Sequence, residues 1–478
     1  MTPALPFVLI APLVAALLLV LVPNWRVASW LNVGACAVTL AAALTLFTAK
    51  PAATAMLVLD AFNVTLIALT AFVGLTTSVF SASYIGHEVA SGKLNPLRLR
   101  FYHAMYQAFL FTMLLALSAN NLGVLWVAVE GATLTTVLMV SLYRTAASIE
   151  AAWKYFILCG VGIALALFGT ILIYLAAQPV MGPGLAAMTW TRLLADSAKI
   201  EPNILNLAFV FLLIGYGTKV GLAPLHAWLP DAHAEGPTPI SAVLSGLLLN
   251  VALYAVLRFK MLLAANGATM APGPLMMVMG LSSLFLAGLM LYRRRDIKRF
   301  FAYSSIEHMG IIAFAFGIGG PLANFAGLLH MAMHSLTKSA IFYAVGHAVQ
   351  AKGTQKIDGI RGLTVSHPAL GWGLLAGVLA IAGLPPFGVF MSEFLLITNT
   401  FARQPLLALV LVLGILLAFG ALVLRVQQIC FGAPTGESHP IHGTLAPLYA
   451  HLALVLLAGL WLPGPLVAWF QTVAAMLG

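Results

Sequence analysis

The sequence has 478 residues, of which 62% are hydrophobic and only 8% are charged. Soluble domains carry about 25% charged residues, so this composition excludes a soluble globular protein and predicts an all-α polytopic membrane protein. The formal net charge of +10 does not indicate nucleic-acid binding, because the basic residues lie in short loops between apolar segments, where they set orientation in the membrane.

About fourteen apolar segments follow one another along the chain, since a spanning helix needs roughly 20 apolar residues. They begin near Leu5, Trp30, Phe62, Ala104, Leu122, Ala151, Ile204, Ile240, Pro274, Phe301, Leu322, Ala369, Leu406 and Leu445. The longest polar connections are residues 81–100, 178–202 and 431–443, so we expect no sizeable soluble domain. No Lys or Arg precedes Arg26, which indicates a retained first helix rather than a cleavable signal peptide.

Lysine and arginine are distributed unevenly between alternate loops. The loops on one side hold fifteen of these residues, including five between Arg293 and Arg299, and the loops on the other side hold six. Because Lys and Arg are enriched in cytoplasmic loops, the first set is predicted to face the cytoplasm, with both termini outside. We expect a multi-pass protein of a bacterial-type inner membrane.

Two of the apolar segments are interrupted by glycine and proline. The first break contains Gly221 and Pro224, and the second contains Gly383, Pro385 and Pro386. Proline removes a backbone donor that hydrocarbon cannot replace, so such breaks occur where the backbone is buried in protein or lines a wet cavity. We therefore predict two discontinuous helices.

The two breaks lie five segments apart, and this odd offset predicts repeats of inverted topology around a site near the membrane midplane. Four parts follow from this reading. Residues 1–102 form an N-terminal three-helix segment, residues 103–263 a first five-helix repeat, residues 274–431 a second, inverted five-helix repeat, and residues 445–478 a C-terminal helix.

Few ionisable residues lie inside the apolar segments. They are Glu130, Lys219, Glu307, His308, His330, His334, Lys338 and Glu393. The spacing of four residues between His330, His334 and Lys338 places them on one helical face. An apolar interior disfavours the charged form of an acid and of a lysine alike, so both can load and release protons, and histidines can pass protons between them through water. This pattern predicts a proton or ion path.

Structural alternatives exist for these residues. The buried acids and lysines could form ion pairs that lock helices together, and each histidine could make a single interhelical hydrogen bond. His226 and His233, in the hairpin after the first break, could contribute to the path at the cytoplasmic mouth or simply cap the hairpin. Glu307 is expected close to the surface, because the basic run ends only at Arg299.

No metal site or cofactor is predicted in this chain. Zinc needs three or four close ligands, whereas the histidine helix offers two beside a lysine that repels a cation. Cys36, Cys159 and Cys430 are far apart and lie in apolar surroundings, so we expect buried packing thiols. Signatures of haem, iron–sulfur clusters and nucleotide binding are lacking, which places any redox chemistry in another polypeptide.

Several motifs together carry a family resemblance. The run PLHAWLPDAHAEGPTPISAVLSG after Lys219, the run RFFAYSSIEHMG, the helix with His330, His334 and Lys338, and the run GLPPFGVFMSEF resemble the antiporter-like membrane subunits of respiratory complex I and its relatives. Among these the chain is most similar to the F component of the hydrogenase-4 type. The resemblance covers roughly residues 60–430 and implies fourteen helices with two inverted five-helix repeats.

The resemblance also implies roles for individual residues. Glu130 matches the acid of the fifth helix and Lys219 the lysine of the broken seventh helix, a pair proposed to gate proton loading. The face with His330, His334 and Lys338 matches the relay of the eleventh helix. Glu393 matches the terminal ionisable residue of the broken twelfth helix, which is placed to release protons outward.

The chain departs from that pattern at two positions. Asn250 stands near the place where several complex I subunits carry a lysine, and an amide cannot carry a proton charge. A link between Lys219 and His330 therefore needs water or a neighbouring group. Glu307 is an extra acid that the complex I subunits generally lack, and we hypothesise that it compensates.

The sequence thus predicts a non-catalytic, proton-translocating subunit of a multisubunit membrane oxidoreductase, either complex I-like or group 4 nickel–iron hydrogenase-like. The expected partners are other membrane subunits, including further antiporter-like subunits, a peripheral redox arm and the lipid bilayer. Protons, or alternatively sodium, are the transported ions. The rival hypotheses are a subunit of a multisubunit cation/proton antiporter or of an ion-coupled bicarbonate uptake system, and a passive membrane scaffold for a redox arm.

Overall fold

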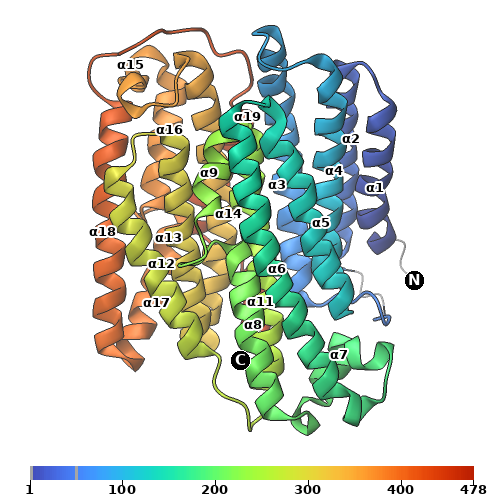
Figure 1. Cartoon of the computed structure of the whole chain (residues 1–478). Coiled ribbons are helices and arrows are strands. Elements are labelled where there is room, and N and C mark those ends of the chain that lie inside the picture. The colour runs from blue at the N-terminus through green and yellow to red at the C-terminus, as the bar shows by residue number, and fades with distance from the viewer. Residues whose placement is uncertain (1–3, 49–51) are drawn as a thin grey trace.

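The computed structural model describes residues 4–48 and 52–478, and this part of the chain is an upright bundle of helices without β-strands (Figure 1). The long helices are α1 (Ala4–Leu21), α2 (Trp25–Thr45), α3 (Ala61–Ala90), α4 (Pro96–Ser118), α5 (Leu122–Val140), α6 (Ala146–Met181), α8 (Pro202–Val220), α11 (Leu249–Ala264), α12 (Gly273–Arg293), α13 (Ile297–Ile318), α14 (Pro321–Lys352) and α18 (Pro405–Cys430). The shorter ones are α7 (Trp190–Ala195), α9 (Trp228–Glu235), α10 (Thr238–Val243), α15 (Leu363–Ser366), α16 (Pro368–Ile381), α17 (Gly388–Arg403), α19 (Ala446–Leu460) and α20 (Gly464–Met476).

Ten helices in the described ranges are long and apolar enough to cross a membrane, or twelve if each of two bent pairs counts as one span. Helix α14 is also long enough, with 32 residues, but its histidines and lysines make it more polar than those ten. Each of the fourteen apolar segments recognised in the sequence begins inside a helix or directly before one. The predicted all-α polytopic fold is confirmed.

Both glycine–proline stretches interrupt a helix. Helix α8 ends at Gly221, which has φ 78° as the C-cap, and the chain resumes as α9 at Trp228. Helix α16 ends before Gly383, which has φ 70°, and α17 begins at Gly388. A left-handed conformation directly after a helix favours glycine, and the prolines that follow cannot donate the next helical hydrogen bond.

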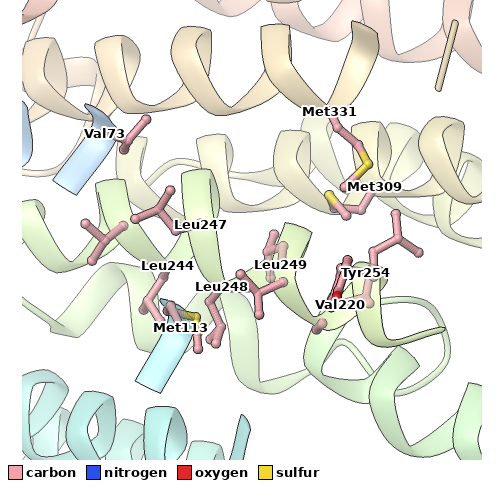
Figure 2. Close-up of a cluster of buried hydrophobic side chains, with 14 of the residues drawn as sticks. Val73, Met113, Val220, Leu244, Leu247, Leu248, Leu249, Tyr254, Met309 and Met331 are labelled. Carbon is pink, nitrogen blue, oxygen red and sulfur yellow. The ribbon is translucent and has the colours of Figure 1, made fainter. Parts of the chain in front are cut away.

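The segment formed by α10, the π-helical turn Leu244–Leu248 and α11 runs through the centre of the bundle and is buried along its whole length. Its leucines pack against side chains of several surrounding helices (Figure 2). In Figure 2, Leu244, Leu247, Leu248 and Leu249 lie beside one another, and Val220 and Met331 both lie to the right of them. Helix α11 packs against α8, and α10 and the π-helical turn pack against α14. The central segment thus contacts both the helix that ends at the first break and the histidine-bearing helix α14.

The loop between α12 and α13 carries the basic cluster and also holds α9 in place. The Arg299 guanidinium forms an ion pair with Asp231 on α9 at 2.7 Å. The buried Lys298 donates to the carbonyl oxygens of Ala234 and Gly236 at 3.0 and 2.6 Å. These carbonyls lie at the C-terminal end of α9, where a helix attracts cations. The second half of the first broken helix is thus fastened to the start of α13.

Candidate functional site

Lys219 lies in the last turn of α8, immediately before the break. The C-terminal end of a helix carries a partial negative charge, so this position favours an ammonium group. The Lys219 Nζ atom lies 3.8 Å from Glu130 Oε2 on α5 and donates to the hydroxyl of Thr133, one helical turn further along α5. It also faces the ring of Tyr155 on α6, with 5.7 Å between the ammonium and the ring centroid.

The pair formed by Lys219 and Glu130 is loosely held. Lys219 is fully buried, whereas the Glu130 side chain is 20% exposed and its Oε2 atom makes no hydrogen bond to any described residue. Elsewhere Arg258 contacts Asp60 at 2.6 Å and donates to the Tyr254 hydroxyl at 2.8 Å, as expected of an ion pair with a structural role. The looser contact leaves room for the two charges of the first pair to separate.

A second cluster forms where α13, α14 and α17 meet. His308 Nδ1 lies 3.0 Å from His330 Nε2, and the two rings stack with their centroids 5.2 Å apart. On its far side His330 Nδ1 lies 2.9 Å from the Ser392 hydroxyl, which donates its own proton to the Val389 carbonyl at 2.7 Å. The Ser392 oxygen must therefore accept from His330 Nδ1, which leaves His330 Nε2 to accept the proton of His308 Nδ1.

His334 and Lys338 continue this cluster along α14. The His334 ring lies 5.8 Å from the His308 ring, and both of its nitrogens lack hydrogen-bond partners within the described part of the chain. Lys338 Nζ donates to the Phe301 carbonyl of α13 at 2.8 Å. Buried polar atoms without a protein partner are commonly satisfied by water, so the gaps in this face can be hydrated.

Glu307 is buried, with 2% exposure, and the expectation of a position near the surface is wrong. That expectation took the basic run as the membrane boundary, but Lys298 is itself buried against α9, so α13 lies inside the bundle along most of its length. Glu307 Oε1 lies 3.7 Å from His308 Nε2, which is too far for a hydrogen bond, and this nitrogen carries a lone pair while the ring proton is on Nδ1.

Glu393 lies on α17, one and a half turns after the second break, and is 6% exposed. One of its carboxylate oxygens lies within 4.8 Å of ring nitrogens of His308 and His330. The carboxylate packs so closely on Gly383 that a β-carbon at that position would overlap it. The break therefore supplies the space that the acid occupies.

The remaining residues of interest lie in the breaks themselves. His226 is half-buried in the connection between α8 and α9, and its ring faces Tyr303 with the centroids 6.3 Å apart. Within residues 4–48 and 52–478, no hydrogen bond or ion pair joins His226 to the other ionisable groups of the site. Pro224, Pro385 and Pro386 are exposed on the surface of the chain.

Polar contacts, which we call the polar bridge, join the central segment to α13 and α14. The hydroxyls of Ser245 and Ser305 lie 2.7 Å apart, joining the π-helical turn to α13. Asn250 donates to the Ser335 hydroxyl at 2.7 Å and to the Met331 carbonyl at 3.1 Å, while its Oδ1 atom has no partner among the described residues. Ser335 and Ser339 of α14 also donate to the Gly246 and Ala242 carbonyls of the central segment, whose leucines form the apolar cluster of Figure 2.

Sequence reasoning counted His308 among the intramembrane ionisable residues but assigned it no step, and it did not single out Ser392 or Tyr155, although all three contact the residues it selected. The sequence did contain a signal for His308. Neighbouring helical residues point about 100° apart, so the Glu307–His308 pair presents polar groups on two faces of one apolar helix, and each face needs a polar partner. The serine and the tyrosine carry no charge, and nothing in the sequence separates them from other buried polar residues.

The chain is similar in sequence to membrane subunits of redox complexes. The family described as NADH:quinone oxidoreductase/Mrp antiporter, TM matches residues 119–418. The hydrogenase-4 component F homolog of Methylacidiphilum infernorum (isolate V4) is 59% identical over 470 residues, which are 98% of this chain and 99% of that protein. NADH-quinone oxidoreductase subunit M of Pseudomonas aeruginosa is 30% identical over 298 residues, which are 62% of this chain and 57% of that protein.

Solved structures share the fold over the whole chain. A chain of the membrane-bound sulfane sulfur reductase, an archaeal respiratory membrane complex, aligns with a TM-score of 0.89 and 21% identity and covers 100% of this chain and 98% of that one. A chain of respiratory complex I from Thermus thermophilus aligns with a TM-score of 0.82 and 23% identity and covers 99% and 100%. At these identities the structural likeness concerns the fold alone.

Proposed function

The chain belongs to the NADH:quinone oxidoreductase/Mrp antiporter transmembrane family, and from this premise we propose that it is a non-catalytic, proton-translocating subunit of a multisubunit membrane oxidoreductase. The relative that is 59% identical over nearly the full length of both chains, a hydrogenase-4 component F homolog, favours a parent complex of the group 4 nickel–iron hydrogenase type or a complex I-like one. Electron transfer and its cofactors belong, on this proposal, to partner subunits.

One observation carries the proposal: two buried clusters of titratable groups each adjoin a broken helix. Intramembrane charge is costly and is retained where an ion path needs it. The Lys219–Glu130 pair adjoins the first break, and the cluster with His308, His330 and Glu393 adjoins the second. Broken helices bring irregular backbone and water to the same depth as the charges.

The first cluster would load the proton. While Glu130 stays close, its negative charge holds the Lys219 ammonium in the charged form. When a redox-driven movement in the complex draws the acid away, the buried ammonium loses that support and gives up its proton. The hydroxyls of Ser245 and Ser305, together with water near Asn250, offer the route to the next cluster.

The second cluster would pass the proton on. An imidazole accepts a proton at one ring nitrogen and releases the proton held by the other. The proton reaches Lys338 and His334 first, crosses the contact between His308 and His330, and arrives at Glu393 beside the second break. The Ser392 hydroxyl accepts from His330 Nδ1 and so keeps that proton in place, which leaves His330 Nε2 to take the proton from His308 and give it to Glu393.

The proposal includes partners and orientation. Further antiporter-like subunits and other membrane subunits would flank this chain in the bilayer, and a peripheral redox arm would supply the driving force. The basic cluster Arg293–Arg299 would face the cytoplasm of a bacterial-type inner membrane, with both termini outside, because Lys and Arg are enriched in cytoplasmic loops.

The test uses the whole complex, purified with its partners and reconstituted into proteoliposomes. In the Lys219→Ala and Glu393→Ala variants we expect proton pumping to fall at least roughly tenfold, because each variant removes a group that carries the proton. Assembly should persist. The control is Lys199→Ala, since this lysine is 69% exposed and pairs with Asp196 at the surface.

Three results would overturn the proposal. Full pumping in both variants would show that the two clusters carry no protons. Sodium-dependent transport without an electron donor would favour the cation/proton antiporter instead, a possibility that the family name also covers. Variants that disturb assembly and never the pH gradient would identify a passive scaffold.

A further inference from the structure

The contact between α13, α14 and α17 brings together the donor atoms of a metal site. His308, His330 and Glu393 each offer one ligand atom, and these three atoms lie within 4.8 Å of one another in the buried interior. Each ligand comes from a different helix, so the arrangement exists only in the folded bundle. Two imidazole nitrogens and a carboxylate oxygen form a donor set that suits Zn²⁺ and similar divalent transition metals.

The geometry of the two imidazoles is close to what zinc requires. Zinc–nitrogen bonds of about 2.0–2.1 Å at tetrahedral angles place two ligand nitrogens about 3.3 Å apart. The facing nitrogens of His308 and His330 are 3.0 Å apart, so a separation of a few tenths of an ångström admits the ion. His330 Nε2 already carries the lone pair, because the proton of that ring is on Nδ1 and is donated to Ser392.

The outer nitrogen of His330 has the partner that a zinc-binding histidine needs. Such histidines almost always give their second ring N–H to a carboxylate, a carbonyl or another oxygen, which fixes the tautomer. His330 has the Ser392 hydroxyl at 2.9 Å, whereas His308 Nε2 makes no hydrogen bond to a described residue and lies 3.7 Å from Glu307 Oε1, which must move closer to accept from it. When the ion binds, the proton of His308 moves from Nδ1 to Nε2, where the Glu307 carboxylate attracts it.

The charges are partly balanced. Glu307 and Glu393 carry two negative charges against the two positive charges of one divalent cation, in an interior that penalises net charge. Lys338 adds a positive charge that interacts with Glu307, although it lies eight residues beyond His330, about 12 Å along α14, and donates to the Phe301 carbonyl. The sequence argument against zinc counted ligands on one helix only, and the structure supplies two more from α13 and α17.

We propose that His308, His330 and Glu393 bind one divalent transition-metal cation, with Zn²⁺ as the probe and water or His334 as the fourth ligand. The bound ion takes the place of the hydrogen bond between the two histidines and ties α17 to α13 and α14. Zinc therefore blocks proton transfer at this point. The binding stands on the geometry alone, whereas the block rests on the proposed proton path.

The experiment titrates Zn²⁺ into the purified complex and records the zinc K-edge X-ray absorption spectrum. We expect a site with imidazole nitrogen and carboxylate oxygen neighbours at about 2.0–2.2 Å. The Glu393→Gln and His308→Asn variants should weaken binding at least tenfold. The control is His451→Gln on α19, because this equally buried histidine bonds to Leu336 and Thr76 outside the cluster.

Unchanged Zn²⁺ affinity in the Glu393→Gln variant overturns the site, and so does a spectrum of a hydrated ion. This variant keeps the size of the side chain and decides the question even if His308→Asn fails to assemble. Zinc that binds at the cluster without slowing proton pumping overturns the block but not the site. Full pumping in Lys219→Ala would instead count against the proposed function and leave the binding result untouched.

Discussion

The clusters at the two helix breaks differ in the kind of charge that they are built to hold. Lys219 occupies the C-terminal turn of a half-helix, where the backbone favours a cation, and one acid lies 3.8 Å away. Glu393 lies in the second turn of a half-helix, beyond the first turn where the backbone favours an anion, and it adjoins a pair of histidines. One break thus adjoins a cluster built on a lysine nitrogen, and the other adjoins a cluster that ends on a carboxylate.

The clusters also differ in redundancy. The first has one acid for a fully buried lysine, so nothing replaces Glu130 if it is removed. The second has both Glu307 and Glu393 near the histidines, so Glu393, where the proposed path ends, remains if Glu307 is neutralised. Variants at these acids test whether the two clusters differ in this way.

The largest effect is expected from Glu130→Gln. The change leaves Lys219 buried without a counter-charge, and proton pumping should fall at least roughly tenfold, the size of a barrier increase of about 1.4 kcal/mol. The matched variant Glu307→Gln should lower pumping less than about threefold, because Glu393 remains. Pumping rates of reconstituted complex measure both, and equal losses would contradict the difference in redundancy.

The next effect is expected from Gly383→Ala at the second break. The new methyl group overlaps the Glu393 carboxylate and pushes it from the histidines, so we expect a several-fold loss of pumping. Gly92→Ala is the control, because Gly92 has a similar φ of 73° with nothing within 4 Å of the added atom. Both variants should lose about 1–2 kcal/mol of stability to backbone strain. Equal pumping in the two would show that the position of Glu393 is unimportant.

A smaller effect is expected from Ser305→Ala in the polar bridge. Removing this hydroxyl breaks the 2.7 Å contact with Ser245 and leaves water alone to connect the clusters. Pumping should fall roughly twofold to threefold, since one hydrogen bond contributes about 0.5–1.5 kcal/mol. Ser118→Ala is the control, because the buried Ser118 hydroxyl bonds only within its own helix. If both serines behave alike, protons do not use this bridge.

No effect on pumping is expected from Asp60→Asn. The variant strips the buried Arg258 of its counter-charge and should destabilise the fold by about 3 kcal/mol, as is usual when one partner of a buried pair is lost. Thermal unfolding of the complex in detergent measures the loss. If the variant is stable but pumps poorly, the Arg258–Asp60 pair takes part in transport, and it does not differ in role from the Lys219–Glu130 pair.

The fold and the ionisable residues were largely accessible from the sequence, for a physical reason. Lipid forces each spanning segment to be long and apolar, so segments, breaks and intramembrane charges stand out from their surroundings. Lys219 before Gly221 and Glu393 after Gly383 could both be recognised in this way. The boundaries of the two repeats and the part played by each residue in transport remain predictions.

The partners of those residues could not be predicted, because they depend on how helices rotate against one another. His308 faces His330 only because α13 and α14 pack with that register, and Ser392 reaches the same ring from α17. The burial of Glu307 was missed for a related reason. A basic run usually marks the membrane surface, and here Lys298 is turned inward to the carbonyls of α9.

Lys298 and Arg299 attach α9 to the start of α13, so the two helices are mechanically coupled. The half-helix beyond the first break cannot tilt without carrying the start of α13, since an ion pair and two carbonyl contacts bind them. His308 lies on the same helix, ten residues after Lys298 and about 15 Å along the helix axis. A tilt of the half-helix at the first break would therefore displace α13 and, with it, the histidine beside the second break.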